Sequence, residues 1–296
     1  MHRHHWGEYP HLPRAEHLSD RYGLGVYALS PCGWGRAGPA RSGGSRCQVV
    51  CGTAAGPRLP GGCVAGQTHA VDLSPSGPPV AAVRIWAGLD EPWRDAFRQA
   101  WEALRTGNIA VGACASTADG EIICSARNRV NDGEGPVGEI FGSALAHAEA
   151  NVLARLPFGS RRDLVLTTTL QPCLQCAGAI RLGPVATVRF AGPDRYWDGC
   201  HDFGKLSARE ARRAQPARIG PRRDELGTFA TLISRIAHLP PGYEQALRAL
   251  GEGPVVDLVH ELEDGGEVER LAAMDVADGL GYLWPRLQEL TKILPP

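Results

Sequence analysis

Four side chains able to bind a metal or move a proton stand in two short motifs of the sequence. His147 and Glu149 lie in SALAHAEANVLARLP, residues 143–157, whose apolar positions otherwise recur at helical spacing. Cys173 and Cys176 stand three positions apart in PCLQCAGAIRL. Residues three apart share one face of a helix, and the positive N-terminal end of a helix favours thiolates. This pattern is typical of a metal clamp.

The types of these donors point to zinc. His147, Cys173 and Cys176 supply three ligands of a tetrahedral zinc site, and a three-residue shell leaves one position for water, as in catalytic zinc centres. Glu149 then has a role that packing does not give it, because it can take a proton from that water and pass it to a ring nitrogen and to leaving ammonia. We expect one zinc ion per chain and Glu149 as the catalytic residue.

The elements that must position these motifs alternate between helix and strand. Asp90 as N-cap, with Pro92 in the first turn, predicts a helix that ends near Gly107. A hairpin of two strands is predicted over 108–116 and 121–130. After the helix that carries His147, the pattern predicts a strand over 163–170, a short helix over 172–182 and a strand over 185–192. This alternation predicts a three-layer α/β/α domain with parallel pairing on at least one side of its sheet.

Taken together, HAE and TTTLQPCLQCAGAI resemble the H-x-E and P-C-x-x-C signature of the zinc-dependent cytidine deaminase-like superfamily. Histidine as the first ligand is similar to the branch that holds tRNA-adenosine, guanine, cytosine and deoxycytidylate deaminases. The resemblance covers residues 93–199 and implies a central mixed sheet of about five strands. Gln171 departs from it, since family members commonly carry Glu before the Pro-Cys pair.

The resemblance also implies candidate contacts to the substrate. SARNR places Asn128 where the asparagine of the family often touches the base, and AVGA, residues 110–113, is similar to the strand that lines the base pocket. Ala146 and Trp197 are the other candidate substrate-binding residues. For Trp197 and its neighbour Tyr196, an aromatic wall over the base and plain core packing stand as equal alternatives.

Composition divides the remainder of the chain. Residues 1–80 are rich in Gly, Pro, Ser and His without apolar periodicity, which predicts a disordered region. Residues 90–204 form the predicted deaminase-like domain. Lys and Arg outnumber Asp and Glu in residues 205–224, which we interpret as a basic connector, either a solvated linker or a contact for RNA. Residues 225–296 are acidic and helical in pattern, which predicts a small helical C-terminal extension.

Charge and hydropathy narrow the classes of protein to which this chain can belong. The formal net charge is -1 and 43% of residues are apolar, so no global basic surface indicates a polyanionic partner. The apolar runs are too short for a bilayer span and the N-terminus lacks the apolar core of a secretory signal. We therefore expect a cytoplasmic protein with no membrane partner, whose nine irregularly spaced cysteines are metal ligands or buried thiols.

These observations predict a zinc-dependent hydrolase that deaminates an amino-substituted nucleobase. The expected partner is a small molecule, a free base, nucleoside or nucleotide, because residues 90–200 carry no basic excess. One alternative is a tRNA adenosine-to-inosine deaminase. Another is a non-catalytic, zinc-stabilised binding module, in which Cys200 and His201 close the zinc shell. A homodimer is a further open expectation.

Overall fold

The computed structural model describes residues 78–157, 163–236 and 238–295. The expectation of disorder over residues 1–80 therefore lies, except for its last three positions, outside the described residues. At the start of the described part stands α1 (Val80–Ala87), a helix that the sequence pattern did not predict. It packs against α10 (Val276–Ile293), close to the C-terminal end of the chain.

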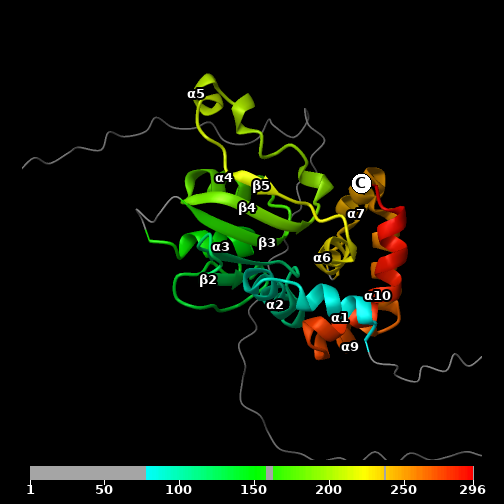
Figure 1. Cartoon of the computed structure of the whole chain (residues 1–296). Coiled ribbons are helices and arrows are strands. Elements are labelled where there is room, and N and C mark those ends of the chain that lie inside the picture. Colours follow the sequence, from blue (N-terminus) through cyan, green and yellow to red (C-terminus); the bar gives the residue numbers. More distant parts are fainter. Residues whose placement is uncertain (1–77, 158–162, 237, 296) are drawn as a thin grey trace, which may run out of the picture. The chain divides into compact units, whose positions relative to one another are not determined.

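Five strands form one sheet in the order β2-β1-β3-β4-β5. β1 (Gly112–Ser116) pairs antiparallel with β2 (Ile122–Arg127) and with β3 (Leu164–Leu170). β3 pairs parallel with β4 (Val185–Gly192), and β4 pairs parallel with β5 (Ala217–Ile219). This mixed sheet with helices packed against it confirms the predicted α/β fold class (Figure 1).

The strand bounds agree with the sequence pattern except at one edge of the sheet. β4 has the predicted bounds, whereas β1 and β2 are shorter than the predicted hairpin strands. β5 lies in residues 205–224, where the sequence predicted only a basic connector. Its three residues are too short a run to predict a strand from the sequence, and the parallel pairing with β4 makes them one. Three short helices precede β5: the 3-10 helices η1 (Arg195–Trp197) and η2 (Phe203–Lys205), and the α-helix α5 (Ala208–Ala211).

The helices of the α/β domain belong to two separate apolar clusters. α2 (Glu91–Arg105) begins as predicted, since the Asp90 Oδ1 atom accepts a hydrogen bond from the Trp93 N–H at 3.1 Å. α3 (Ala148–Ala154) and α4 (Leu174–Leu182) pack against each other and share a cluster with inward-facing residues of the sheet. The buried residues of α2 belong to the other cluster, which continues into the C-terminal helices.

From residue 225 the chain is helical, as the sequence pattern predicted. The helices are α6 (Glu225–Arg235), α7 (Pro241–Leu247), α8 (Gly253–Asp264), α9 (Glu267–Ala273) and α10, with the turn η3 (Arg248–Glu252) between α7 and α8. In the part of the chain that the structure describes, none of the helices is both long enough and apolar enough to cross a bilayer.

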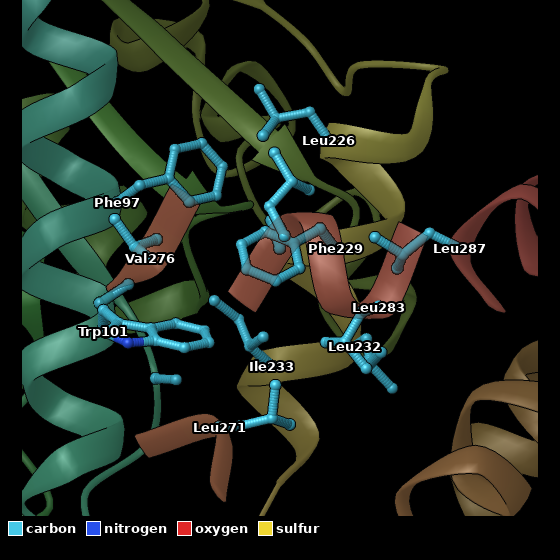
Figure 2. Packing of buried hydrophobic residues seen from close by; sticks show 14 of the residues in the cluster. Phe97, Trp101, Leu226, Phe229, Leu232, Ile233, Leu271, Val276, Leu283 and Leu287 are labelled. Carbon is cyan, nitrogen blue, oxygen red and sulfur yellow. The ribbon is translucent and has the colours of Figure 1, made fainter. Parts of the chain in front are cut away.

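α6 joins these helices to the α/β domain through an aromatic stack (Figure 2). The Phe229 ring is fully buried, with its centroid 6.0 Å from that of Phe97 and 5.8 Å from that of Trp101. Leu232 and Ile233 extend the same cluster toward α10. Every residue from Leu226 to Arg235 is buried, so α6 is an interior helix shared by the two parts of the fold.

α6 also approaches the end of β4 at main-chain distance, because glycines stand at the contact. A Cβ atom on Gly192 would lie 2.7 Å from the Thr231 Oγ1 atom and 2.8 Å from the Thr231 nitrogen. A Cβ atom on Gly227 would lie 2.3 Å from the Arg222 carbonyl oxygen. Neither distance leaves room for a larger residue. Gly192 thus lets the middle of α6 pack against the end of β4, and Gly227 lets the first turn of α6 pack against the segment that precedes it.

Candidate metal centre and its cavity

The starts of two neighbouring helices bring three metal-binding atoms together. His147 is the N-cap of α3, and Cys173 is the N-cap of α4. The Nδ1 atom of His147 lies 3.4 Å from the Sγ atom of Cys173 and 3.4 Å from that of Cys176. α4 begins at Leu174 and not at the predicted Pro172, since Pro172 precedes the N-cap. The N-terminal starts of α3 and α4 thus bring together the donors that the sequence motif predicted.

These three atoms fit a zinc ion. Bonds of about 2.0–2.3 Å at tetrahedral angles put ligand atoms roughly 3.5–3.8 Å apart, and all three donor atoms lie within 4.8 Å of one another. Among the described residues, Cys200 and His201 are not part of this group. The Cys200 Sγ atom instead lies 3.6 Å from the Pro172 carbonyl oxygen. Among the described residues, three side chains therefore form the donor group.

The local electrostatics prepare Cys173 to bind a cation. Its hydrogen bond with Cys176 and its contact with His147 outweigh burial and lower the pKa of the Cys173 thiol to about 4. Its place at the N-terminus of α4 adds the positive end of the helix dipole. A thiolate is the form of cysteine that binds zinc, so the site is ready to take the metal at neutral pH.

Glu149 lies beside the metal donors in the first turn of α3. Its Oε2 atom accepts a hydrogen bond from the Cys176 thiol at 3.5 Å, and its Oε1 atom accepts one from the Thr168 hydroxyl at 3.2 Å. The side chain is buried, and burial raises the pKa of the carboxyl group. A carboxyl group with a raised pKa, held next to the metal donors, is suited to accept and return a proton.

A cavity of about 330 Å³ opens at this site. It is lined by Glu149, by His147 and Cys173, and by the predicted substrate contacts Asn128 and Trp197. The Oδ1 atom of Asn128 accepts a hydrogen bond from the Val130 N–H at 3.1 Å, which leaves its amide NH₂ to donate to a ligand.

Not all of the predicted contacts face the cavity. Ala146 is fully buried and is not among the lining residues. Within the predicted strand segment, Val111 lines the cavity, whereas Ala110 and Ala113 are buried in the two cores. Strand alternation places neighbouring side chains on opposite faces, so only part of the segment can face a ligand.

The loop that carries Asn128 is held by a network around Asp132. The Oδ2 atom of Asp132 accepts hydrogen bonds from Arg127 at 2.7 Å and from Arg129 at 2.8 Å. Its Oδ1 atom accepts one from the Asn108 amide at 2.7 Å. Burial acts in the opposite sense, but these donors lower the pKa of the Asp132 carboxyl group. The network fixes the backbone on both sides of Asn128.

The far wall of the cavity comes from residues that the sequence reasoning did not propose. Ser234 and Arg235 end α6, and His238 and Tyr243 stand just after it and in α7. Asp194, which directly follows β4, lines the same wall. One signal was present in the sequence: Arg235 ends an uncharged run rich in apolar residues, and an arginine there must find buried partners.

Comparisons with known proteins agree with this geometry. Residues 90–191 match the family described as the cytidine and deoxycytidylate deaminase zinc-binding region. The chain is 30% identical over 115 residues to tRNA-specific adenosine deaminase 2 of Xenopus tropicalis, a match to 36% of this chain and 62% of that protein. It is 31% identical over 90 residues to cytosine deaminase of Candida albicans, a match to 29% of this chain and 55% of that protein.

Among solved structures, one from a study of tRNA:A34 deaminases is 22% identical. It covers 43% of this chain and 93% of its own, with a TM-score of 0.34. The present chain spans less than two thirds of the length of the two relatives named above.

The fold and the donor set thus define an α/β domain with a three-residue group suited to zinc. Within this class, residues 90–191 match the cytidine and deoxycytidylate deaminase zinc-binding region, and His147, Cys173 and Cys176 lie grouped where they could hold the metal.

Proposed function

We propose that the protein is a hydrolytic deaminase that replaces the amino group of a nucleobase ring by oxygen and releases ammonia. The observation that carries this proposal is Glu149, whose carboxylate lies against the zinc donors and lines the cavity. A purely structural zinc site does not require a buried carboxyl group at this position, and burying a carboxyl group costs free energy of hydration.

Each group in the cavity has a part in the proposed reaction. His147, Cys173 and Cys176 would hold the zinc ion, whose Lewis acidity would lower the pKa of a water molecule toward neutrality. Glu149 accepts a proton from the attacking water and delivers it to the ring nitrogen, then takes the remaining proton of the added hydroxyl group and passes it to the departing amine. Asn128 donates its amide hydrogens to an acceptor on the ring and so fixes the amine-bearing carbon near Glu149. Water and the amine are consumed, and the carbonyl product and ammonia are formed.

The charges support a free base, nucleoside or nucleotide as the substrate. The cavity is lined by the carboxylates of Glu149 and Asp194 against one arginine. Part of the positive charge in residues 205–224 is engaged locally, because Arg213 pairs with Glu210 and Arg222 pairs with Asp224. A polynucleotide is attracted by free Lys and Arg side chains, and such local pairing weakens that attraction.

The likeness to tRNA-specific adenosine deaminase 2 favours the second candidate, a deaminase that acts on an adenosine of transfer RNA. The two candidates differ in their dependence on salt, since RNA binding weakens steeply with ionic strength. A non-catalytic binding module has less support, because the zinc group of the described residues lacks a fourth side chain.

The test is a screen of the zinc-loaded protein for ammonia release. Adenine, guanine and cytosine are compared with their nucleosides, with their monophosphates and with transfer RNA, each at low and at high salt. We expect turnover of a small compound with a weak dependence on salt. Turnover of transfer RNA alone, lost at high salt, would establish the second candidate. Release of no ammonia from any of these compounds would overturn both.

A further inference from the structure

Arg235 is an arginine with only 2% of its surface exposed, and all its guanidinium nitrogens have partners. Its Nε and Nη2 atoms donate to the Glu252 Oε2 atom at 3.2 and 3.1 Å. Nη2 also donates to the Asp194 Oδ1 atom at 3.3 Å, and Nη1 donates to the Tyr243 hydroxyl oxygen at 2.7 Å. One side chain thus joins the segment after β4, the helix α7 and the turn η3.

The partners of Arg235 fall into two groups. Asp194 and Tyr243 line the zinc cavity together with Arg235 itself. Glu252 does not line it and borders a neighbouring cavity instead. Glu252 therefore anchors the guanidinium group from behind, while the other two partners face the space where a ligand would lie.

Stability alone does not account for this cluster. Two buried carboxylates surround one guanidinium group, and each buried charge costs several kcal/mol in lost hydration. Apolar residues of similar volume would satisfy the packing requirement at a lower cost. A cluster of charges that faces the zinc cavity is better explained by what it presents to a ligand.

An aromatic group continues the same wall. The ring centroid of Tyr196 lies 5.1 Å from that of Trp197 and 5.3 Å from that of Tyr243, both in edge-to-face arrangement. The Arg235 guanidinium carbon lies 5.4 Å from the Tyr243 ring centroid. Arg235 therefore holds one of the three rings by hydrogen bond and by cation–π contact.

We propose that Arg235 is a positioning residue, which holds Asp194 and Tyr243 against the substrate, and that the C-terminal helices thereby select the ring that enters the zinc cavity. The ligand class that fits is a planar amino-substituted heterocycle that offers an N–H donor to the Asp194 carboxylate and a face to the aromatic group. This inference rests on the proposed deaminase function and adds the residues that determine its specificity.

Variants that separate positioning from folding test the proposal. Arg235→Lys keeps the positive charge but replaces the planar guanidinium group by a single ammonium group, so it cannot bind Asp194 and Tyr243 together. Asp194→Asn removes the charge facing the cavity at almost constant volume. Arg248→Lys is the matched control, because Arg248 also lies among the C-terminal helices and pairs with Glu244 and Asp257, but at the surface.

Melting temperature and zinc content are measured first on each variant. KM and kcat are then determined for the compound with the fastest ammonia release. Calorimetry measures the binding of adenine, guanine, cytosine and their nucleosides. For Arg235→Lys and Asp194→Asn we expect KM and the dissociation constant to rise about 10- to 100-fold, as for a lost charged hydrogen bond. We expect kcat and zinc content to change little, and Arg248→Lys to match the wild type.

A purely structural role predicts a different result. The loss of affinity in Arg235→Lys would then follow its loss of melting temperature. Asp194→Asn would bind the compounds with wild-type affinity. Wild-type affinity in both variants overturns the proposal, as does a wild-type protein that binds none of the compounds. If Arg235→Lys does not fold, Asp194→Asn alone decides. Binding that Asp194→Asn weakens, without ammonia release by the wild type, refutes the deaminase function but supports the selection of the ring.

Discussion

Replacing Phe229 by alanine should measure how strongly the C-terminal helices are joined to the zinc-binding domain. The Phe229 ring is fully buried in α6 and lies between Phe97 and Trp101 of α2. Removing a buried phenylalanine side chain costs about 3–5 kcal/mol, the sum of lost transfer free energy and of the cavity left behind. Because two ring contacts are lost as well, we expect the upper half of that range.

The loss converts to a measurable shift. For a folded unit of this size, about 1 kcal/mol lowers the melting temperature by roughly 2–4 °C, so Phe229→Ala should melt roughly 8–20 °C below the wild type. Urea unfolding followed by circular dichroism gives the free energy directly. Phe141→Ala is the matched control, because it deletes the same atoms from a ring that is 41% exposed. It should cost less than half as much.

Two results would refute the reasoning. A loss near that of Phe141→Ala would mean that the stack does not stabilise the protein. Two separate transitions in the wild type would mean that the C-terminal helices and the sheet unfold independently. A shared core predicts one cooperative transition instead.

Three further predictions concern the site. Glu149→Gln should keep zinc and the melting temperature but lower kcat by about 10²–10⁴-fold, because the proton carrier is lost; unchanged turnover would assign proton transfer to another group. Cys173→Ala should lose both zinc, measured by elemental analysis, and stability, since the metal ties α3 to α4; full zinc occupancy would contradict the assigned ligands. Asp132→Asn should destabilise the protein by about 3 kcal/mol at pH 7. The pKa of Asp132 is lower in the folded than in the unfolded state. The difference in unfolding free energy between wild type and variant should therefore be fully present above the unfolded-state pKa and disappear as pH falls through the folded-state pKa. A pH-independent difference in urea unfolding would contradict this.

The zinc group could be predicted because its signals are local. The spacing of Cys173 and Cys176, the H-x-E motif and the Asp90 cap each lie within a few residues of the element that they define. β4 was predicted with its bounds because Val185 and Val188 lie in a short apolar run between turn residues. Local chemistry of this kind is readable without knowledge of distant contacts.

The far wall of the cavity could not be predicted in the same way. Arg235 and Tyr243 meet Asp194 only through folding, across 41 residues in the case of the Arg235–Asp194 bond. β5 is a strand only because β4 lies beside it, and Ala146 is turned into the core by the backbone before α3. Pairings between distant segments leave little trace in a single sequence, so residues that depend on them appear only in the structure.

The glycine contact between β4 and α6 makes the cavity easy to re-engineer. Because Gly192 and Gly227 let the first half of α6 pack at close range, the path of the helix depends on contacts other than those of the cavity-lining residues at its end. Ser234 and His238 line the cavity without belonging to the Arg235 cluster. A library randomised at these two positions would therefore vary the shape of the binding wall on a fixed backbone. Substitutions at either glycine would instead displace the whole wall.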